Sequence, residues 1–381
     1  MKKEVVLLLF ILVACAPLEP LNPHPIIANN PELNYDQKVF YQRIENAFQP
    51  IDCPTFKRNF NDIYDGPMID THVHIAPLPD NPNYDENNGR PAMSVNVKIT
   101  DYTCMLDAER TTKTFAFFAV WDPITRESLD LVKRTMETYP DSFIPFIMTP
   151  DHDDRADGFP TVNAETLSEY LAVYPNLFKG YGEIGLYERS GDGGPKGAKA
   201  LPPNSDRLND IYPILKNNSL LVYFHLGEGQ QDSFEAVLTA NPDLNFIWHG
   251  DQLIVYENGT QNLEALDEIL SNHPNAYYGV DELYGDTWLL RPEITKEEFL
   301  AHFENKEDLL AKDSATWKDF IERHPDQVLW GTDRGWSAPW SIDPVVAVTL
   351  NDYSRAFIAK LDPAVQEKFA YKNAEKLVMK K

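Results

Sequence analysis

Short apolar runs that end in a polar residue or a turn recur along most of this chain. Three clear examples are residues 220–225, 245–250 and 328–333, which read LLVYFH, NFIWHG and VLWGTD. Runs of this length, bounded by turns, are typical of strands buried on both faces, as in a parallel sheet. Similar runs begin near residue 69 and cover 114–121, 143–148, 181–185 and 276–280, so the pattern predicts eight strands.

Amphipathic stretches separate these runs and predict helices between them. The predicted helices are Arg126–Tyr139, Ala164–Tyr174, Asp206–Asn217, Asp232–Ala240, Asn262–Asn272, Thr316–Arg323 and Val345–Lys360. Strands that alternate with helices imply a parallel sheet. Eight such units in about 320 residues fit a closed barrel better than an open doubly wound sheet. The predicted fold class is therefore α/β, a (β/α)8 TIM barrel.

The expected strand ends carry side chains that can bind a metal ion. His72 and His74 are one residue apart on the first strand, so they point to the same side of it. Four later runs end on or carry further candidates, namely Glu183, His225, His249 and Asp333. Neutral imidazoles and carboxylates are ligands of divalent ions. A lone His-x-His is a common accident, so the prediction of a metal site at the C-terminal ends of the strands depends on the whole set.

This arrangement resembles the amidohydrolase superfamily and, within it, the amidohydrolase-related branch of metal-dependent hydrolases. That family has His-x-His on strand 1, Glu or a carboxylated Lys on strand 4, His on strands 5 and 6, and Asp on strand 8. The matching positions are His72, His74, Glu183, His225, His249 and Asp333, and the resemblance covers roughly residue 62 to the C-terminus. Lys179 precedes its strand, so it is not taken as a carboxylated ligand. Residues 181–186 also resemble strand 4 of TatD-type metal-dependent deoxyribonucleases.

The resemblance implies a divalent metal cofactor, zinc first among the candidates, with one or two ions. The residues that would hold the first ion are His72, His74, His225 and Asp333. Such an ion lowers the pKa of a bound water from about 15.7 toward roughly 7. Asp333 would be both ligand and general base, and it would pass the proton to the leaving group. His249 would polarise the electrophilic oxygen or bind a second ion, and Glu183 could bridge two ions.

Several functions fit this site. The first is hydrolysis of a small ester, lactone or amide, and the second is decarboxylation of an aromatic or dicarboxylic acid, because the branch resembles lyases with the same ligands. A TatD-like phosphoesterase and a non-catalytic binding lipoprotein are further alternatives. The net charge of −25, from 59 acidic and 34 basic residues, would repel a polyanion, although a solvated surface explains the acidity as well. The expected partner is a small-molecule substrate and no nucleic acid, and a homo-oligomer is left open.

Long loops after the strands would carry specificity in such a barrel. They cover 76–97, 187–205 and 282–314, the last with a helical patch near 296–303. The candidate substrate contacts are Arg90, Arg189, Tyr278, Arg334 and Trp336. Arg334 could clamp a substrate carboxylate or form a salt bridge to the acidic surface, and Asp281 is similarly ambiguous. The other histidines are expected in a surface turn or in solvent, namely His24, His152, His273, His302 and His324.

The N-terminus predicts export. Lys2 and Lys3 precede an apolar run at 5–13, which ends in Leu-Val-Ala-Cys at 12–15. This run is too short to span a bilayer as a mature helix, and it resembles the signal peptide of a bacterial lipoprotein. The resemblance implies cleavage before Cys15 and lipidation of that cysteine, the alternative being a non-lipidated secretory peptide. The expected location is the bacterial cell envelope, with the protein held at a membrane through its N-terminal lipid only.

The predicted organisation is a signal peptide at 1–14, a tether and N-terminal extension at 15–60, and the barrel domain at 61–381. A Pro- and Asn-rich tract at 16–35 would be the tether. Cys53 and Cys104 are an even pair. In an oxidising compartment they could form a disulfide between the extension and the first barrel helix, and the alternative is two buried free thiols.

Overall fold

The computed structural model describes residues 38, 41, 44–75, 98–120, 125–148, 159–187, 200–250, 255–257, 260–281, 283, 294–335 and 339–379. Eight parallel strands form one sheet in the order β1-β2-β3-β4-β5-β6-β9-β10. Their bounds are β1 (Ile69–Ile75), β2 (Lys113–Ala119), β3 (Phe143–Met148), β4 (Gly180–Gly185), β5 (Leu221–His225), β6 (Phe246–His249), β9 (Ala276–Val280) and β10 (Val328–Trp330). The sheet curls into a nearly closed barrel, which confirms the predicted TIM-barrel fold.

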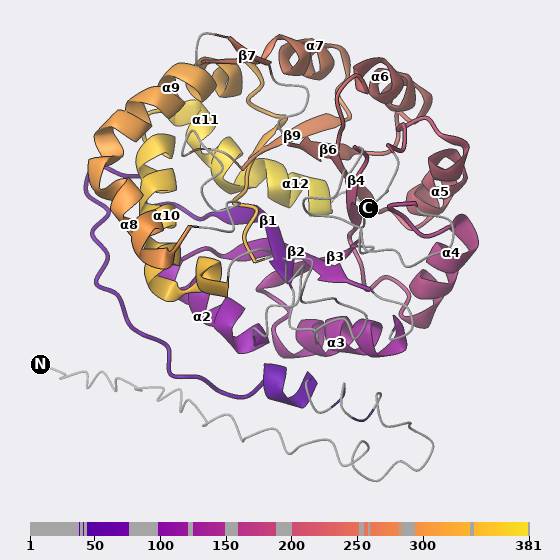
Figure 1. The fold of residues 1–381 in the computed structure, drawn as a ribbon, viewed down its shortest axis with the longest axis horizontal. Coiled ribbons are helices and arrows are strands. Elements are labelled where there is room, and N and C mark those ends of the chain that lie inside the picture. The colour runs from indigo at the N-terminus through magenta and orange to yellow at the C-terminus, as the bar shows by residue number, and fades with distance from the viewer. Residues whose placement is uncertain are drawn as a thin grey trace, which may run out of the picture.

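Helices surround the strands as an outer ring (Figure 1). The described helices are α2 (Ile99–Glu109), α3 (Thr125–Thr138), α4 (Ala164–Val173), α5 (Asp206–Asn217), α6 (Gln231–Ala240), α7 (Glu264–Asn272), α8 (Lys296–His302), α9 (Lys306–Arg323), α10 (Pro344–Ile358), α11 (Pro363–Glu367) and α12 (Asn373–Met379), the last of which lies across the ring and not in it. The strands are apolar and almost fully buried because side chains fill the barrel on one face and helices cover the other. Phe117, Phe146 and Tyr223 meet inside the barrel, with ring centroids 4.8–6.2 Å apart.

The seam between β10 and β1 is held mainly by isolated contacts. Residues 73 and 334 form a single parallel bridge, and the backbone N–H of His74 donates to the carbonyl of Arg334 at 2.7 Å. The hydroxyl of Thr71 donates to the carbonyl of Trp330 at 2.8 Å. Outside the seam, α10 packs against α2. The two ends of the sheet are thus joined by a few bonds instead of a regular ladder.

The C-terminal segment covers the end of the barrel opposite the expected site. After α11 the chain makes a π-helical turn at Lys368–Lys372 and continues into α12, which contacts β1 and β10. The side-chain amide of Asn373 donates to the carbonyls of Pro325 and Val328, where β10 begins. Figure 1 shows α12 lying across the middle of the ring. These C-terminal elements were not predicted from the sequence.

Two predicted helices begin more than one residue away from their start in the structure. The helix expected at 316–323 is the second half of α9, whose first half buries only Leu309 and Leu310 before Asp313. The helix expected from residue 262 begins at Glu264, because residues 260–262 form strand β8 (Thr260–Asn262), which pairs with β7 (Val255–Glu257) in a small antiparallel hairpin. Weak apolar periodicity in the first case and a hairpin outside the main sheet in the second account for the errors.

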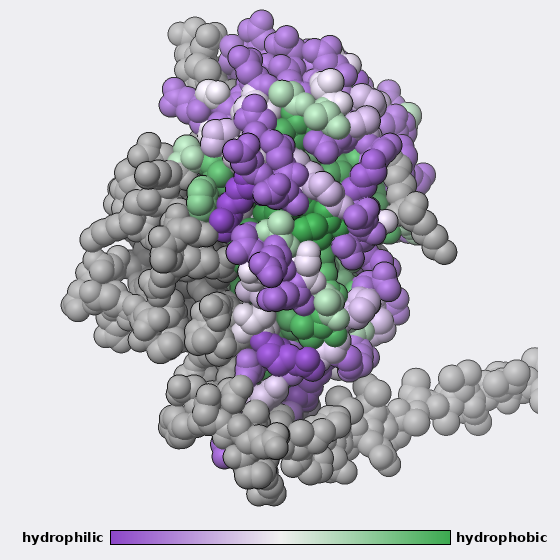
Figure 2. Space-filling view, turned by 90° about the vertical axis from the view of Figure 1, so that its right-hand side faces the viewer, coloured by the Kyte–Doolittle hydropathy of each residue, from purple (hydrophilic) through white to green (hydrophobic). Residues whose placement is uncertain are grey.

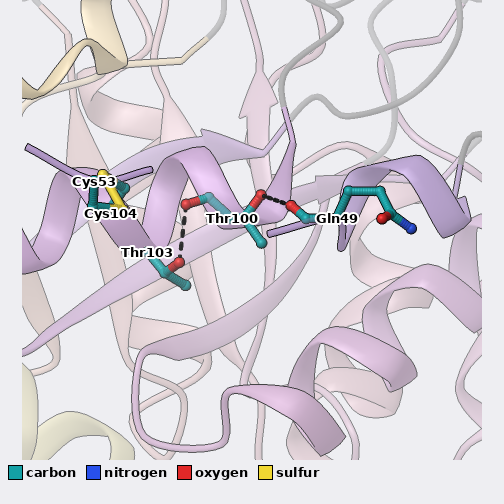
Figure 3. Close-up of a disulfide and its surroundings, with 5 residues drawn as sticks. All are labelled: Gln49, Cys53, Thr100, Thr103 and Cys104. Atoms are coloured by element: carbon teal, nitrogen blue, oxygen red, sulfur yellow. Dashed lines mark hydrogen bonds between the residues drawn. A yellow bond between two sulfur atoms is a disulfide. The ribbon is translucent and has the colours of Figure 1, made fainter. Parts of the chain in front are cut away.

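The N-terminal extension packs on the outside of the barrel over α3, α2 and α10. The ring of Phe48 stacks on that of Tyr139, and Glu45 forms an ion pair with Arg134 at 2.6 Å. Cys53 and Cys104 are joined in a disulfide, beside which the hydroxyl of Thr100 donates to the carbonyl of Gln49 (Figure 3). The structure therefore favours the disulfide over two free thiols.

The side of the barrel that carries α4, α5 and α6 presents mostly hydrophilic residues to solvent, with hydrophobic residues visible between them (Figure 2). Within the described ranges only Val345 and Met379 are large hydrophobic side chains with substantial exposure. None of the helices described has both the length and the apolar character needed to cross a membrane.

Candidate metal centre

The six predicted metal-binding residues converge at the C-terminal end of the barrel. Two come from β1, one from β4, one each from the last positions of β5 and β6, and one from the turn after β10. Their nitrogen and oxygen atoms form two groups that share one residue, and within each group these atoms lie within 4.8 Å of one another. The first group is His72, His74, Glu183 and Asp333, and the second is Glu183, His225 and His249.

The first group is built around the two histidines of β1. The Nε2 atoms of His72 and His74 are 3.1 Å apart. Each lies 3.3 Å from Oε2 of Glu183. Oδ1 of Asp333 is 3.3 Å from the first imidazole and 3.0 Å from the second. Two nitrogens and two carboxylate oxygens therefore surround a common point.

Glu183 also faces the second group with its other oxygen. Oε1 of Glu183 is 3.0 Å from Nδ1 of His225 and 2.8 Å from Nε2 of His249. Residues 225 and 249 are paired in register on neighbouring strands, which places their imidazoles side by side. One carboxylate thus lies between two pairs of histidines, with one oxygen toward each pair.

Asp333 reaches the cluster from a backbone conformation that is uncommon for its residue type. Its φ is +49°, in the left-handed region, where a residue other than Gly usually carries strain. The side chains of Asp333, Glu183 and His225 are 12%, 14% and 17% exposed, whereas that of His72 is fully buried. Solvent or a small molecule therefore reaches the cluster on the side of these three residues.

The structure also places Asp281, which the sequence left ambiguous, against this cluster. It follows β9 directly and is 6% exposed. Its Oδ2 atom is 2.8 Å from Nδ1 of His72 and 3.2 Å from Nδ1 of His249. The available signal in the sequence was its place at the end of an apolar run, the same place that the predicted ligands occupy.

Burial and charge act in opposite directions on the pKa values of the cluster. Burial alone would lower the pKa of His249, but the charge of Glu183 and the contacts with Asp281 and Glu183 together outweigh it and raise this pKa to about 9. The pKa of His72 is also raised, because Asp333 and Asp281 outweigh its burial. Burial would raise the pKa of Glu183, but His249 and His225 hold it well below its usual range. The carboxylates of the cluster thus stabilise positive charge on the groups between them.

A divalent metal ion fits this set of residues. Nitrogen and carboxylate oxygen are the ligands that zinc and related ions take in proteins. Nε2 of His249 and Oε1 of Glu183 are 2.8 Å apart, yet this nitrogen makes no hydrogen bond to any described residue. Atoms that approach so closely without hydrogen-bond geometry are what a set of ligands aimed at one cation would show. A cation would also neutralise the buried carboxylates.

The structure does not support Arg334 as a substrate ligand. Its guanidinium is fully buried and donates to the carboxylates of Asp70 and Glu109 at 2.9–3.1 Å. Asp70 in turn accepts hydrogen bonds from the hydroxyl of Thr332 and from the backbone N–H of His72. Burial raises the pKa of Asp70 to about 6, although Arg334 opposes this shift. The prediction of a substrate clamp was wrong. Arg334 does form salt bridges, but with two buried carboxylates and not with the acidic surface that the sequence suggested.

Tyr278 is also not a substrate contact in this structure. Its side chain is 1% exposed and packs between Trp248 and Trp317 in the layer between sheet and helices. Among the histidines expected in solvent, His324 is buried and contacts Asp267 at 2.9 Å, so that expectation was wrong. His273 and His302 are described and are partly buried instead of fully exposed. The remaining predictions fall outside the described residues, namely Trp336, Arg90, Arg189, His24 and His152.

The raised pKa of His249 predicts opposite pH dependence with and without metal. Its pKa of about 9 in the fold exceeds the ordinary 6.5, so protonation stabilises the metal-free protein below pH 6.5, and this contribution is lost as the pH rises through 9. Metal binding needs neutral imidazoles and therefore strengthens over the same interval. As the pH rises from roughly 6 to 9.5, the unfolding temperature Tm should fall in the presence of a chelator and rise in excess zinc. If Tm changed with pH in the same direction in chelator and in zinc, this prediction would be contradicted.

Comparison with solved structures finds proteins with which this chain shares part of its fold. Similar solved structures include a zinc-bound amidohydrolase from Burkholderia multivorans, with 12% identity, coverage of 82% of this chain and 99% of that one, and a TM-score of 0.49. A probable 2-pyrone-4,6-dicarboxylic acid hydrolase from Acinetobacter baumannii, with citric acid bound, has 12% identity, coverage of 82% and 98%, and a TM-score of 0.48. A dihydroxybenzoic acid decarboxylase from a Polaromonas species, with manganese and an inhibitor bound, has 12% identity, coverage of 83% and 97%, and a TM-score of 0.46.

No curated protein matches the sequence. A family model described as amidohydrolase matches residues 69–379, which span the barrel from β1 to α12 and include all six predicted metal-binding residues. The chain therefore belongs to the amidohydrolase family and is an enzyme of that superfamily.

Proposed function

We propose that this enzyme is a metal-dependent hydrolase that cleaves a small ester, lactone or amide. The observation that carries the proposal is Asp333, a carboxylate that contacts the histidines of the first group while its side chain remains 12% exposed. Hydrolysis needs a base that takes a proton from water and returns it to the leaving group. A partly exposed carboxylate inside a metal-binding cluster is suited to both tasks.

The residues divide the work between the two groups. A divalent ion, with zinc as the first candidate, would acidify a water molecule and polarise the bond under attack. Asp333 would accept the proton of that water and deliver it to the leaving group. His249, on the far side of the cluster, would orient the electrophilic oxygen of the substrate or help to hold a second ion. Glu183 supports two ions, because each of its oxygens faces a different histidine pair.

The experiment that tests this function measures metal and products on the same protein. The chain is reconstituted with zinc, manganese or iron, and we expect one to two ions per chain, because the two groups share one carboxylate. Metal content below about 0.2 equivalents would overturn the metal site. The loaded enzyme is then incubated with lactones, esters and amides, and separately with aromatic and dicarboxylic acids. Acid release from the first panel supports the hydrolase, whereas carbon dioxide release from the second would replace it by a decarboxylase.

We propose in addition that the enzyme is an exported lipoprotein anchored through Cys15. The basic and apolar N-terminal segment and the Leu-Val-Ala-Cys sequence at 12–15 support this proposal. The disulfide between Cys53 and Cys104 also supports it, since such bonds persist mainly in oxidising compartments.

Replacing Cys15 by Ser is expected to move the protein from the membrane fraction to the soluble fraction. The reason is that acyl chains, and not the barrel, would provide the affinity for the membrane. Fractionation after a salt wash measures the change. The matched control is Cys53→Ser, which also replaces one cysteine, here a disulfide-bonded one, but leaves the lipidation site, and it should stay with the membrane. A Cys15→Ser variant that remains in the membrane pellet would refute the lipid anchor.

A further inference from the structure

Asp281 contacts both groups of the metal centre through the imidazole nitrogens that face away from Glu183. Its Oδ2 contacts Nδ1 of His72, which belongs to the first group, at 2.8 Å, and Nδ1 of His249, which belongs to the second, at 3.2 Å. The side chains of all three residues are at most 6% exposed. Asp281 thus contacts the Nδ1 atom of one histidine from each group.

This contact determines which nitrogen of each imidazole carries hydrogen. An ionised carboxylate only accepts hydrogen bonds. Nδ1 of His72 therefore donates to Asp281, and we infer the same for Nδ1 of His249, which lies 3.2 Å from the same oxygen. The lone pair of each neutral ring is then on Nε2. Nε2 of His72 lies 3.3 Å from Oε2 of Glu183, and Nε2 of His249 lies 2.8 Å from Oε1 of the same residue. Both lone pairs are therefore on the nitrogens that face the shared carboxylate.

Two glycines near Asp281 lack the Cβ atoms that would otherwise occupy the space of its side chain. A Cβ at Gly331, on the neighbouring strand end, would stand 2.1 Å from Oδ1 of Asp281. A Cβ at Gly279 would stand 2.9 Å from the hydroxyl of Tyr223 and 3.5 Å from the same Oδ1. Glycine weakens a strand, and inside a strand it often marks a close approach. The position of Asp281 is thus built into β9 and the end of β10.

We propose that Asp281 is a positioning residue that fixes the ring orientation and tautomer of His72 and His249 and so couples the two halves of the metal centre. The inference rests on the proposed metal-dependent function and deepens it. Hydrogen bonds behind metal-binding histidines commonly change metal affinity by 10–100-fold. Here one carboxylate would do this for two histidines, so its loss should weaken both groups together.

The test compares Asp281→Ala, Asp281→Asn and Tyr278→Phe in the full chain. Zinc affinity is measured by competition with a chelator, and the histidine nitrogens of the zinc-loaded protein are followed by 15N NMR. We expect Asp281→Ala to lose about 10–100-fold in affinity at every zinc position and to shift the signals of two histidines. Asp281→Asn keeps one acceptor oxygen and should lose less. Tyr278→Phe removes a polar atom from the outward face of the same strand and should match the wild type.

A separate variant covers the case in which Asp281→Ala does not fold. Gly331→Ala keeps every ligand and Asp281 in the sequence, but its Cβ would stand 2.1 Å from Oδ1 of Asp281 and 3.2 Å from Cβ of His72. Because the carboxylate is the closer contact and also touches His249, zinc binding should weaken at both groups, and not only at that of His72. Wild-type zinc affinity in both Asp281→Ala and Gly331→Ala, or weakening at one zinc position only, would overturn the inference. A wild-type protein that binds no zinc, manganese or iron would instead overturn the proposed function, so the two failures are distinguishable.

Discussion

Replacing Asp333 by Asn is expected to abolish turnover while most metal remains bound. The amide oxygen of Asn can still coordinate an ion, but it cannot accept a proton from water, so the step that needs a base is lost. A loss of roughly 10²–10⁴-fold in kcat is the usual cost of removing such a group. The measurement is kcat on any substrate found by the product screen, with metal content determined on the same samples.

The matched control for this result is His72→Ala. It removes a fully buried nitrogen of the first group, so metal and activity should be lost together. Kinetics alone would not separate the two variants, and metal content does. Should Asp333→Asn retain more than about a tenth of the wild-type rate, Asp333 is only a ligand or a structural residue. The base would then be sought in Glu183 or His249.

Replacing Glu183 by Ala is expected to reduce the metal content of the wild type, so that a centre with two ions keeps one or none. The variant loses both oxygens that lie between the histidine pairs, and the second group then keeps only His225 and His249. It also loses the charge that raises the pKa of His249, so that imidazole becomes easier to deprotonate. Elemental analysis after reconstitution, together with the magnetic coupling of a manganese-loaded sample, measures the change.

Glu183→Gln is the control that preserves shape. It keeps one oxygen but no charge, and it should fall between wild type and Glu183→Ala in metal content. If the wild type holds a single ion and Glu183→Ala holds it equally well, the shared carboxylate is not a bridge. The centre would then be mononuclear and built from the remaining residues of the first group.

The fold and the ligand positions were predictable because both depend on local patterns. Apolar runs such as LVYFH at 221–225 form buried strands. A polar side chain at the end of such a run lies at the C-terminal end of the barrel. The six converging side chains were found in this way. Asp281 belongs to the same pattern, but an acid after a strand can equally begin a solvated loop, and its partners lie 209 and 32 residues away in sequence.

The errors come from contacts between distant parts of the chain. Arg334 follows a predicted ligand, but its partners Asp70 and Glu109 are on β1 and α2, which no local pattern connects to it. Tyr278 faces the helices because side chains alternate along a strand and Asp281 faces the interior three positions later, and that orientation of Asp281 is known only from the structure. The packing of the N-terminal extension depends on pairs such as Glu45 with Arg134, which local sequence patterns do not reveal.

The seam between β10 and β1 has a consequence for how the barrel opens. His72 and His74 lie on one side of it and Asp333 lies just beyond the other, so a fluctuation that parts these strands also separates the first group. Local opening is cheapest where few backbone hydrogen bonds must break. The amide of His74, bonded to Arg334 across the seam, should therefore exchange with solvent sooner than amides between β2 and β3. An ion bound by ligands on both sides of the seam would hold the two strands together. Its loss would first be detected as faster hydrogen exchange at the amide of His74.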